Sequence, residues 1–256
     1  MAVLEVKHVS KIYGGKAART ALNHVSLTVE DGEFVGIMGP SGSGKTTLLN
    51  LIATIDEPTA GEIRLNGANP HERNEEETAM YRRRELGFVF QQFHLLDTLT
   101  VEENIALPLV LDGVAAAQAE TMVQGVMDKL GIAGSREQFP IELSGGQMQR
   151  AAVARAIIHR PYLLLADEPT GNLDSKAARE VMELFGKLNE EEKMTTLMAT
   201  HDPVAASYCS RVLFMKDGRL YNEIYRGESR QSFFQNIIDM LSLLGGDSVD
   251  FSSVRL

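Results

Sequence analysis

The amino-acid sequence predicts an α/β fold with a mainly parallel sheet, and three observations lead to that prediction. Short apolar runs at 33–38 and 162–166 have the length and composition of buried strands. Each run is followed by a loop and then by a helical pattern, which is the element order of parallel α/β proteins. The stretch from about 92 to 160 contains segments rich in Ala, Gln, Met and Leu, and it predicts a helical insert in that core.

The first third of the chain consists mostly of predicted strands. Residues 3–9 and 22–29 alternate with a period of roughly two, and we expect them in an N-terminal antiparallel β region. Asp31-Gly32 is a turn signal before the strand at 33–38. The other elements expected here are a helix at 46–54, strands at 62–66 and 87–91, and a charged, solvated helix at 75–85.

The rest of the chain combines predicted helices and strands. Thr100 and Glu103 have the spacing of a capping box and mark the start of a helix. Asp217-Gly218 lies between two strand-like stretches and predicts a hairpin. The elements expected here are helices at 115–131, 145–160 and 175–192, and strands at 162–166, 195–199, 211–215 and 219–225.

A last amphipathic helix is expected near the C-terminus. Its apolar stripe recurs at helical spacing and comprises Phe233, Phe234, Ile237, Ile238, Leu241 and Leu244. We favour packing of this stripe on its own domain over docking on a partner or a second copy, and we expect Asp247 to Leu256 to be frayed. The expected organisation is one domain over 1–226, with a helical subdomain at about 92–160, then a C-terminal helix and tail over 227–256.

The composition excludes several classes of protein. The 256 residues include 35 acidic and 25 basic side chains, a net charge of −10 that argues against a general nucleic-acid binder. A hydrophobic fraction of 44% is enough for a full core. The single cysteine, Cys209, excludes a disulfide framework and any multi-cysteine metal site. There is no apolar run of the roughly 18 to 20 residues that a membrane helix needs, and Met1–Ser10 does not resemble a signal peptide. We therefore expect a soluble cytosolic chain.

The run from Gly39 to Thr46 matches the phosphate-binding pattern G-x-x-x-x-G-K-[ST] between a predicted strand and a predicted helix. Glycines let the backbone N–H groups converge on a polyphosphate, and the helix adds its positive N-terminal end. In such a P-loop NTPase core, Lys45 reaches the β- and γ-phosphates and the Thr46 hydroxyl binds Mg²⁺. The motif predicts a nucleoside triphosphate as ligand.

A second half of the same site is expected after the apolar strand Leu163–Ala166. That strand ends in Asp167 and Glu168, where the chain turns and both carboxylates can face the ligand. Asp167 suits the Mg²⁺ shell through water, because Mg²⁺ keeps several of its waters. Glu168 suits the task of polarising the attacking water.

The five residues Leu143, Ser144, Gly145, Gly146 and Gln147 precede a predicted helix and form a second helix start with free N–H groups. With the two motifs above, this run resembles the signature of the ATP-binding-cassette family over roughly residues 1–226. In that resemblance Tyr13 is the aromatic residue that stacks on adenine, Gln91 the glutamine of the loop that also reaches the metal, and His201 the switch histidine. Asn172-Leu173-Asp174 is the loop after the catalytic glutamate.

The resemblance implies a head-to-tail dimer with two molecules of ATP and Mg²⁺ between the chains. Glu168, His201, Lys45 and Gln91 would be catalytic, and Thr46, Gln91 and Asp167 would hold the metal. The signature residues Leu143, Ser144, Gly145, Gly146 and Gln147, together with Asp174, would act on the nucleotide of the partner. The nucleotide-binding residues would be Tyr13, Gly39, Pro40, Ser41, Gly42, Ser43, Gly44, Lys45, Thr46 and Thr47.

A finer resemblance concerns the stretches Phe90–Val101 and Leu165–Lys176, which are similar to macrolide-export, lipoprotein-release and cell-division cassettes. His201–Cys209 and Arg230–Gln235 are closer to the bacitracin-resistance type, which detoxifies antimicrobial peptides. This implies a membrane permease as partner, with Phe93–Thr100 in its docking groove, and a sensor kinase that acts through the permease. The chain would lie on the cytoplasmic face of a bacterial membrane. The alternative is a regulatory, cell-division-type cassette that signals through a membrane partner without transport.

Overall fold

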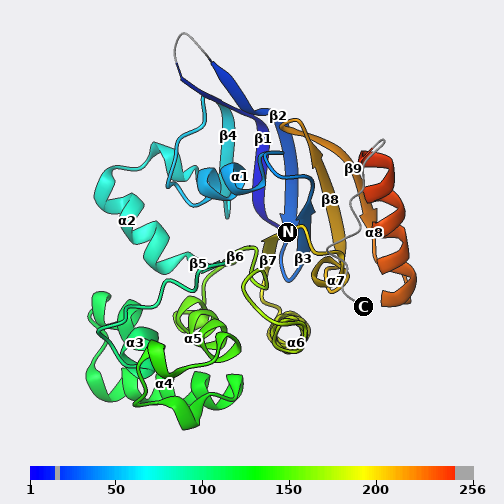
Figure 1. The fold of residues 1–256 in the computed structure, drawn as a ribbon. Helices are drawn as coiled ribbons and strands as arrows, with labels where there is room; N and C mark the ends of the chain where they lie inside the picture. The colour runs from blue at the N-terminus through cyan, green and yellow to red at the C-terminus, as the bar shows by residue number, and fades with distance from the viewer. Residues whose placement is uncertain (15–17, 246–256) are drawn as a thin grey trace.

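Two β-sheets and eight α-helices make up the described part of the computed structural model, residues 1–14 and 18–245 (Figure 1). The smaller sheet is antiparallel, and β1 (Ala2–Tyr13) lies in it between β2 (Arg19–Glu30) and β4 (Ala60–Leu65). It confirms the antiparallel region expected at the N-terminus. The tail at 247–256, for which we expected fraying, lies outside the described residues.

The larger sheet has six strands and carries the parallel core that the sequence predicts. Its order is β5 (Leu86–Phe90), β6 (Leu163–Asp167), β7 (Thr196–Ala199), β3 (Phe34–Met38), β8 (Arg211–Lys216) and β9 (Arg219–Tyr225). The first five strands are parallel, and only β9 runs antiparallel, to β8. Asp217-Gly218 forms the turn of that hairpin, as expected.

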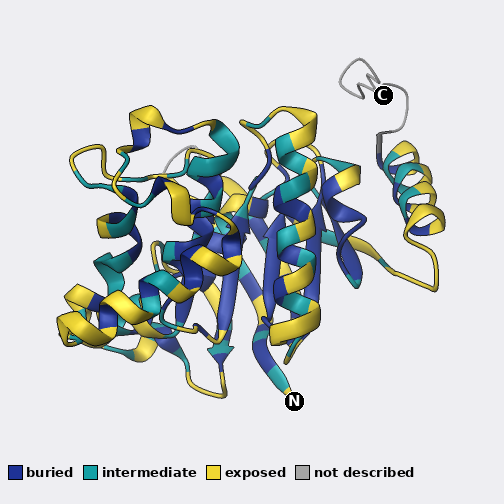
Figure 2. Cartoon of the chain, turned by 90° about the horizontal axis from the view of Figure 1, so that it is seen from below, coloured by how far each residue is buried: buried dark blue, intermediate teal, exposed yellow. Residues whose placement is uncertain are grey.

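Alternation along the central strands separates two hydrophobic clusters. In β3, Val35 and Ile37 belong to the cluster shared with the antiparallel sheet and α1 (Lys45–Ile52). Phe34 and Met38 belong to the cluster shared with the helices on the other face. Successive side chains of a strand point to opposite faces, so a strand covered on both faces is apolar throughout. Figure 2 shows this burial along the central strands.

The remaining helices cover the larger sheet and extend beyond it. Of these, α3 (Val101–Leu111), α4 (Ala116–Leu130) and α5 (Gly145–Ile157) pack on one another, and α5 also packs on β5 and on α6 (Ser175–Glu192). The other α-helices are α2 (Glu75–Arg84), α7 (Pro203–Ala206) and α8 (Arg230–Gly245), and short 3-10 turns lie at Pro70–Glu72, Ala133–Ser135 and Pro140–Glu142. Among the residues described, none of these helices is both long and apolar enough to cross a bilayer.

Local signals place several of these helices. Thr100 Oγ1 accepts a hydrogen bond from the Glu103 N–H at 3.2 Å, and Glu103 Oε2 accepts one from the Thr100 N–H at 2.8 Å, which confirms the capping box of α3. The helix expected to be solvated at 75–85 has one buried side chain that the sequence did not predict. Tyr81 of α2 is fully buried and its hydroxyl donates to Ile52 O at 2.9 Å, so α2 is fixed to the end of α1.

The C-terminal helix α8 packs on its own chain, as we favoured. Phe233, Ile237 and Leu244 are buried with exposed fractions of 1%, 0% and 5%. The helix lies beside α7 and β9 (Figure 1). The Lys216 ammonium, at the end of β8, donates to Leu244 O at 2.9 Å and satisfies a carbonyl in the last turn.

Candidate functional site

The predicted phosphate-loop and catalytic residues come together because the strands before them are parallel and end at one edge of the sheet. The phosphate loop follows β3, Gln91 follows β5, Asp167 and Glu168 end β6, and His201 follows β7. Loops at the carboxyl ends of parallel strands are the usual place for ligands in α/β proteins.

The phosphate loop has a backbone that only glycine fits at two of its positions. Gly44 has a φ of +104°, and a Cβ there would lie 2.6 Å from Ala21 O. Gly39 has a φ of +156°, and a Cβ there would lie 2.2 Å from Met215 O. Helix α1 then begins at Lys45 with no side-chain cap and no acidic residue in its first turn. Its first N–H groups are therefore free to bind an anion.

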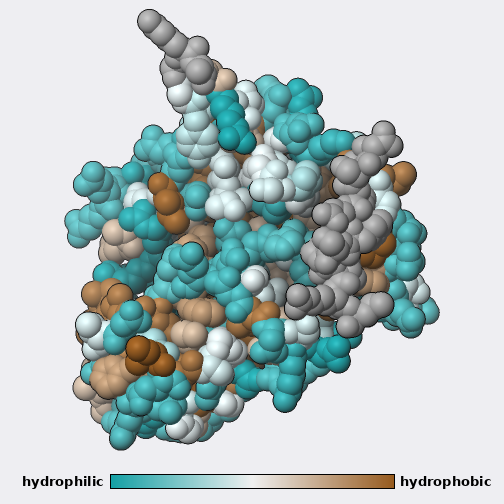
Figure 3. Space-filling view, in the orientation of Figure 1, coloured by the Kyte–Doolittle hydropathy of each residue, from teal (hydrophilic) through white to brown (hydrophobic). Residues whose placement is uncertain are grey.

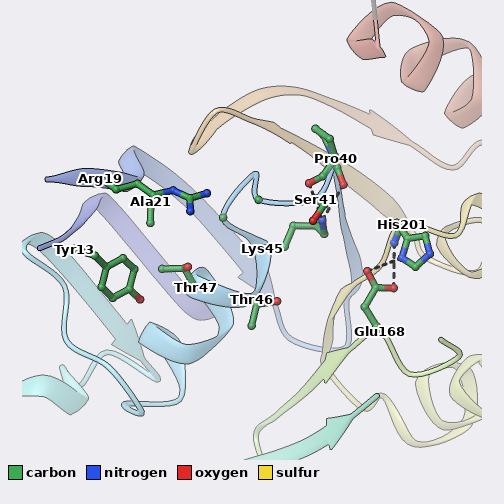
Figure 4. A pocket seen from close by; sticks show the side chains of 13 residues that line it. Tyr13, Arg19, Ala21, Pro40, Ser41, Lys45, Thr46, Thr47, Glu168 and His201 are labelled. Carbon is green, nitrogen blue, oxygen red and sulfur yellow. Dashed lines mark hydrogen bonds and ion pairs between the residues drawn. The ribbon is translucent and has the colours of Figure 1, made fainter. Parts of the chain in front are cut away.

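A cavity of about 620 Å³ lies over this loop (Figure 4). It is lined by Tyr13, Arg19, Ala21, Gly39, Pro40, Ser41, Gly42, Gly44, Lys45, Thr46, Thr47, Glu168 and His201. Apart from Arg19 and Ala21, the other eleven lining residues are all ones that the sequence assigns to nucleotide binding or catalysis. Ser43 does not line the cavity, since its side chain is buried behind the loop with a hydroxyl that has no partner among the described residues.

Lys45 is held inside the loop that precedes it. Its ammonium donates to Gly39 O at 2.8 Å and to Pro40 O at 3.2 Å. Burial lowers the pKa of Lys45, while the carboxylates of Glu168 and Asp167 act in the opposite direction. The ammonium is thus oriented by backbone carbonyls at the floor of the cavity, where it faces two acidic groups.

Thr46 and Asp167 form the oxygen pair that the sequence assigns to the metal. Thr46 Oγ1 donates to Asp167 Oδ1 at 3.3 Å. Burial and the nearby Glu168 raise the pKa of Asp167, and the bond from Thr46 and the charge of Lys45 lower it. A hydroxyl and a carboxylate suit Mg²⁺, which takes few protein oxygens and keeps water and phosphate oxygens. The described residues contain no cluster of three or more His, Cys, Asp or Glu side chains placed for a metal.

Glu168 and His201 contact each other at the cavity through two interactions. Glu168 Oε1 lies 2.9 Å from His201 Nδ1, and Glu168 Oε2 accepts a hydrogen bond from the His201 N–H at 3.2 Å (Figure 4). The hydrogen bond with Glu168 raises the pKa of His201 despite partial burial. Glu168 has a left-handed φ of +49°, a strained backbone that re-aims its side chain after the strand.

Gln91 lies beside the site and does not line the cavity. Its Nε2 donates to Asn172 Oδ1 at 3.2 Å, and Asn172 Nδ2 donates to Gln91 O at 3.0 Å. Gly171 makes room for this contact, because a Cβ there would lie 2.7 Å from Gln91 Nε2. Gln91 is thereby joined to the loop that leads from Glu168 to α6.

The signature residues lie apart from the cavity, and none of them lines it. Ser144 caps α5: its hydroxyl accepts from the Gln147 N–H at 3.3 Å, and Gln147 Oε1 accepts from the Ser144 N–H at 2.9 Å. Gly145 faces Leu173, and Asp174 caps α6 by accepting from the N–H groups of Lys176 and Ala177, both at 2.9 Å. Leu143 is buried and Gly146 packs near Ala177. These two helix starts therefore lie next to each other.

The family model described as "ABC transporter" matches residues 22–171, which is more than half of the chain. The chain belongs to the ABC transporter family. It is an ATPase of the ABC type. ABC transporter ATP-binding protein YxdL of Bacillus subtilis is 58% identical over 254 residues, 99% of each chain. Bacitracin export ATP-binding protein BceA of Halalkalibacterium halodurans is 48% identical over 248 residues, which cover 96% of this chain and 98% of that protein.

The fold of this ABC ATPase is also similar to that of a solved structure. The dimeric structure of MJ0796, a protein of Methanocaldococcus jannaschii, matches with a TM-score of 0.80 and 40% identity, over 88% of this chain and 99% of that one. A second structure of MJ0796 is described as a post-hydrolysis state bound to ADP and Pi. The match confirms the fold class expected from the sequence.

Two features of this ABC ATPase site escaped sequence reasoning. Arg19 lines the cavity because it pairs with Tyr13 across the β1–β2 hairpin, and a Cβ on Gly42 would lie 3.4 Å from its Nη2. The position of Arg19 depends on the register between β1 and β2, which no local pattern in the sequence records. The other feature is the set of contacts that holds Tyr13, described below.

Proposed function

We propose that the chain is the ATP-hydrolysing subunit of a bacterial ABC transporter and works as a head-to-tail dimer on a separate membrane permease. The supporting observation is that the phosphate loop and the signature helix start are both exposed for anion binding but lie in different places. The cavity formed by one chain includes the loop, Glu168 and His201 and leaves out Ser144, Gly145 and Gly146. A second copy would bring its signature to the open side of that cavity.

In the proposed site each side chain has a distinct task. Lys45 and the free N–H groups of α1 bind the β- and γ-phosphates, and Tyr13 stacks on the base. Thr46 and Asp167 would hold Mg²⁺, which would supply positive charge against the transferred phosphoryl group. Glu168 orients the attacking water, and the partner's signature N–H groups cap the γ-phosphate.

The Glu168–His201 contact implies a rearrangement before hydrolysis. Both oxygens of the glutamate are engaged by His201, so neither is fully available to a water molecule. His201 is also placed to reach the γ-phosphate, since both side chains line the same cavity. When His201 turns to the phosphate, Glu168 is released to act on water.

The relatives, and not the chemistry of the cavity, support the proposal of a permease and its substrate. YxdL and BceA match nearly the whole chain, and BceA is described as a bacitracin export protein. We infer that this chain serves a permease for antimicrobial-peptide export or resistance on the cytoplasmic membrane face, with a sensor kinase acting through that permease. Brown side chains gather over α3 and α4 in Figure 3. Val110 and Leu111 of α3 are 62% and 60% exposed, and Leu96, before α3, is 47% exposed.

Glu168→Gln tests the enzymatic part of this proposal. The amide keeps the shape of the side chain but is a poor base. We expect ATP binding to persist, dimers to accumulate, and turnover to fall by about 10²- to 10³-fold or more. Size-exclusion chromatography with ATP and a phosphate-release assay measure these effects. Wild-type turnover in this variant would contradict the role of Glu168.

Resistance in cells tests the transport part. A strain that lacks the gene should become more sensitive to peptide antibiotics that act on the cell envelope, and the wild-type gene should restore resistance. The Glu168→Gln gene should fail to restore it although the protein is made. Full resistance with Glu168→Gln would separate the protein's role from ATP hydrolysis.

A further inference from the structure

The ring of Tyr13 is held by the side chains of Lys11 and Asp56. Its hydroxyl donates to Asp56 Oδ2 at 2.6 Å. The Lys11 ammonium lies over the ring, 4.8 Å from its centroid. The same ammonium donates to Asp56 Oδ1 at 2.5 Å and to Glu57 O at 2.7 Å. Lys11, Tyr13 and Asp56 therefore form a closed set of contacts that fixes both the edge and one face of the ring.

The position of Lys11 leaves the other face of the ring for a ligand. Tyr13 lines the cavity and is 42% exposed, whereas Lys11 is absent from the lining and its side chain is only 12% exposed. The ammonium thus covers the face turned away from the cavity. A cation on one face of an aromatic ring is attracted to it, and a flat base on the opposite face adds stacking.

Asp56 also links the ring to the phosphate loop. It follows α1, the helix that begins at Lys45, and its N–H donates to Asn50 O in that helix at 3.3 Å. The neighbouring segment is clamped to β1, because Thr59 Oγ1 accepts from the Ile12 N–H at 3.0 Å and the Thr59 N–H donates to Ser10 O at 2.8 Å. One end of α1 therefore holds the phosphates, and the chain beyond its other end holds the aromatic ring.

We propose that Lys11 and Asp56 are positioning residues for the nucleotide base, which keep the Tyr13 ring at a fixed distance from the phosphate loop with one face open to the cavity. Neither residue touches the nucleotide. The inference rests on the proposed function, because it requires that Tyr13 receives the base. The contribution of Lys11 and Asp56 therefore depends on Tyr13 and on the adenosine part of the ligand.

Two ligands and a small set of variants test this in the full-length chain. ADP and inorganic pyrophosphate share a diphosphate, and only ADP carries a base, so their affinities separate stacking from phosphate binding. Lys11→Met removes the charge and keeps the length of the side chain, and Asp56→Asn weakens its hold on Tyr13 and Lys11. Lys11→Arg keeps a cation. Lys7→Met is the matched control on the same strand, since Lys7 pairs with Glu5 at 2.5 Å and lies outside the cavity.

We expect Tyr13→Ala to weaken ADP binding about tenfold, and Lys11→Met and Asp56→Asn to weaken it about three- to tenfold. Pyrophosphate binding should not change in any of these variants. Lys11→Arg and Lys7→Met should stay within about twofold of wild type. Adding Lys11→Met to Tyr13→Ala should cause no further loss, because the lysine acts through the ring.

The outcomes separate this inference from the proposed function. If Tyr13→Ala weakens ADP binding but Lys11→Met and Asp56→Asn do not, the positioning role is wrong while the nucleotide site stands. If pyrophosphate binding falls together with ADP binding, Lys11 and Asp56 support the loop and not the base, which also overturns the inference. If Tyr13→Ala has no effect and pyrophosphate does not bind to wild type, the proposed site itself is wrong.

Discussion

The contact between Glu168 and His201 is the residue-scale feature with the clearest solution signature. Two interactions hold the pair, the Nδ1 contact and the backbone N–H, and both come from the segment after β7. The strength of the contact is limited, because the His201 side chain is 68% exposed and solvent screens the charges.

Titration of His201 tests this contact. The hydrogen bond with Glu168 raises the pKa of His201 above the ordinary 6.5, so we expect the ring to titrate above that value by NMR. Glu168→Gln should bring the pKa back towards 6.5. A raised folded pKa also means that the pair's stabilisation is fully present below pH 6.5 and is lost as pH rises through the folded pKa.

A second histidine is the control for that titration. Burial lowers the pKa of His71, and its Nε2 lies 2.9 Å from Leu51 O, far from Glu168 in the chain and outside the cavity. It should titrate below 6.5 and stay unchanged in Glu168→Gln. An unshifted His201 in the wild-type protein would show that the contact is not populated in solution.

At the scale of elements, helix α8 should contribute to stability through one face only. Ile237 is fully buried, and Leu243 on the same helix is 68% exposed. We expect Ile237→Ala to lower the free energy of unfolding by about 2 to 4 kcal/mol through lost burial and a cavity. Leu243→Ala should change it by less than about 0.5 kcal/mol. Urea unfolding measures both, and equal small effects would mean that α8 does not pack as described.

The sequence predicted most elements because their signals are local. The phosphate loop needs glycine at fixed positions, and Thr100 and Glu103 satisfy each other within one turn. The signals that it missed are tertiary. The four-residue α7 has no periodicity to detect, and Tyr81 looks like part of a charged helix until α1 is placed against it.

Most residues of the candidate site could also be predicted, because their signals in the sequence are local as well. Motif residues can be recognised by their spacing in the sequence, and the parallel strands bring most of them to one edge of the sheet. Arg19 enters the cavity through the hairpin register, and Asp56 reaches Tyr13 from 43 residues away. Such contacts depend on how the two sheets meet, and no local pattern in the sequence records that.

At the scale of the whole molecule, the phosphate loop with Glu168 lies apart from the signature with Asp174, at the adjoining starts of α5 and α6. We propose that these are two halves of a site, which a head-to-tail dimer with two-fold symmetry would join. Defects in different halves should then complement each other between chains.

Mixing two inactive variants tests that arrangement. Lys45→Ala disables the phosphate loop. Ser144→Asp disables the signature, because the aspartate still caps α5 but repels the triphosphate. In a mixed dimer both defects fall in one site and the other site is intact. Equal amounts of the two variants should therefore recover about a quarter of wild-type ATPase activity if dimers form at random. The matched control is a mixture of Lys45→Ala with Glu168→Gln. Those residues belong to the same half, so every site carries a defect and no activity should return. Recovery in both mixtures, or in neither, would contradict a site shared between two chains.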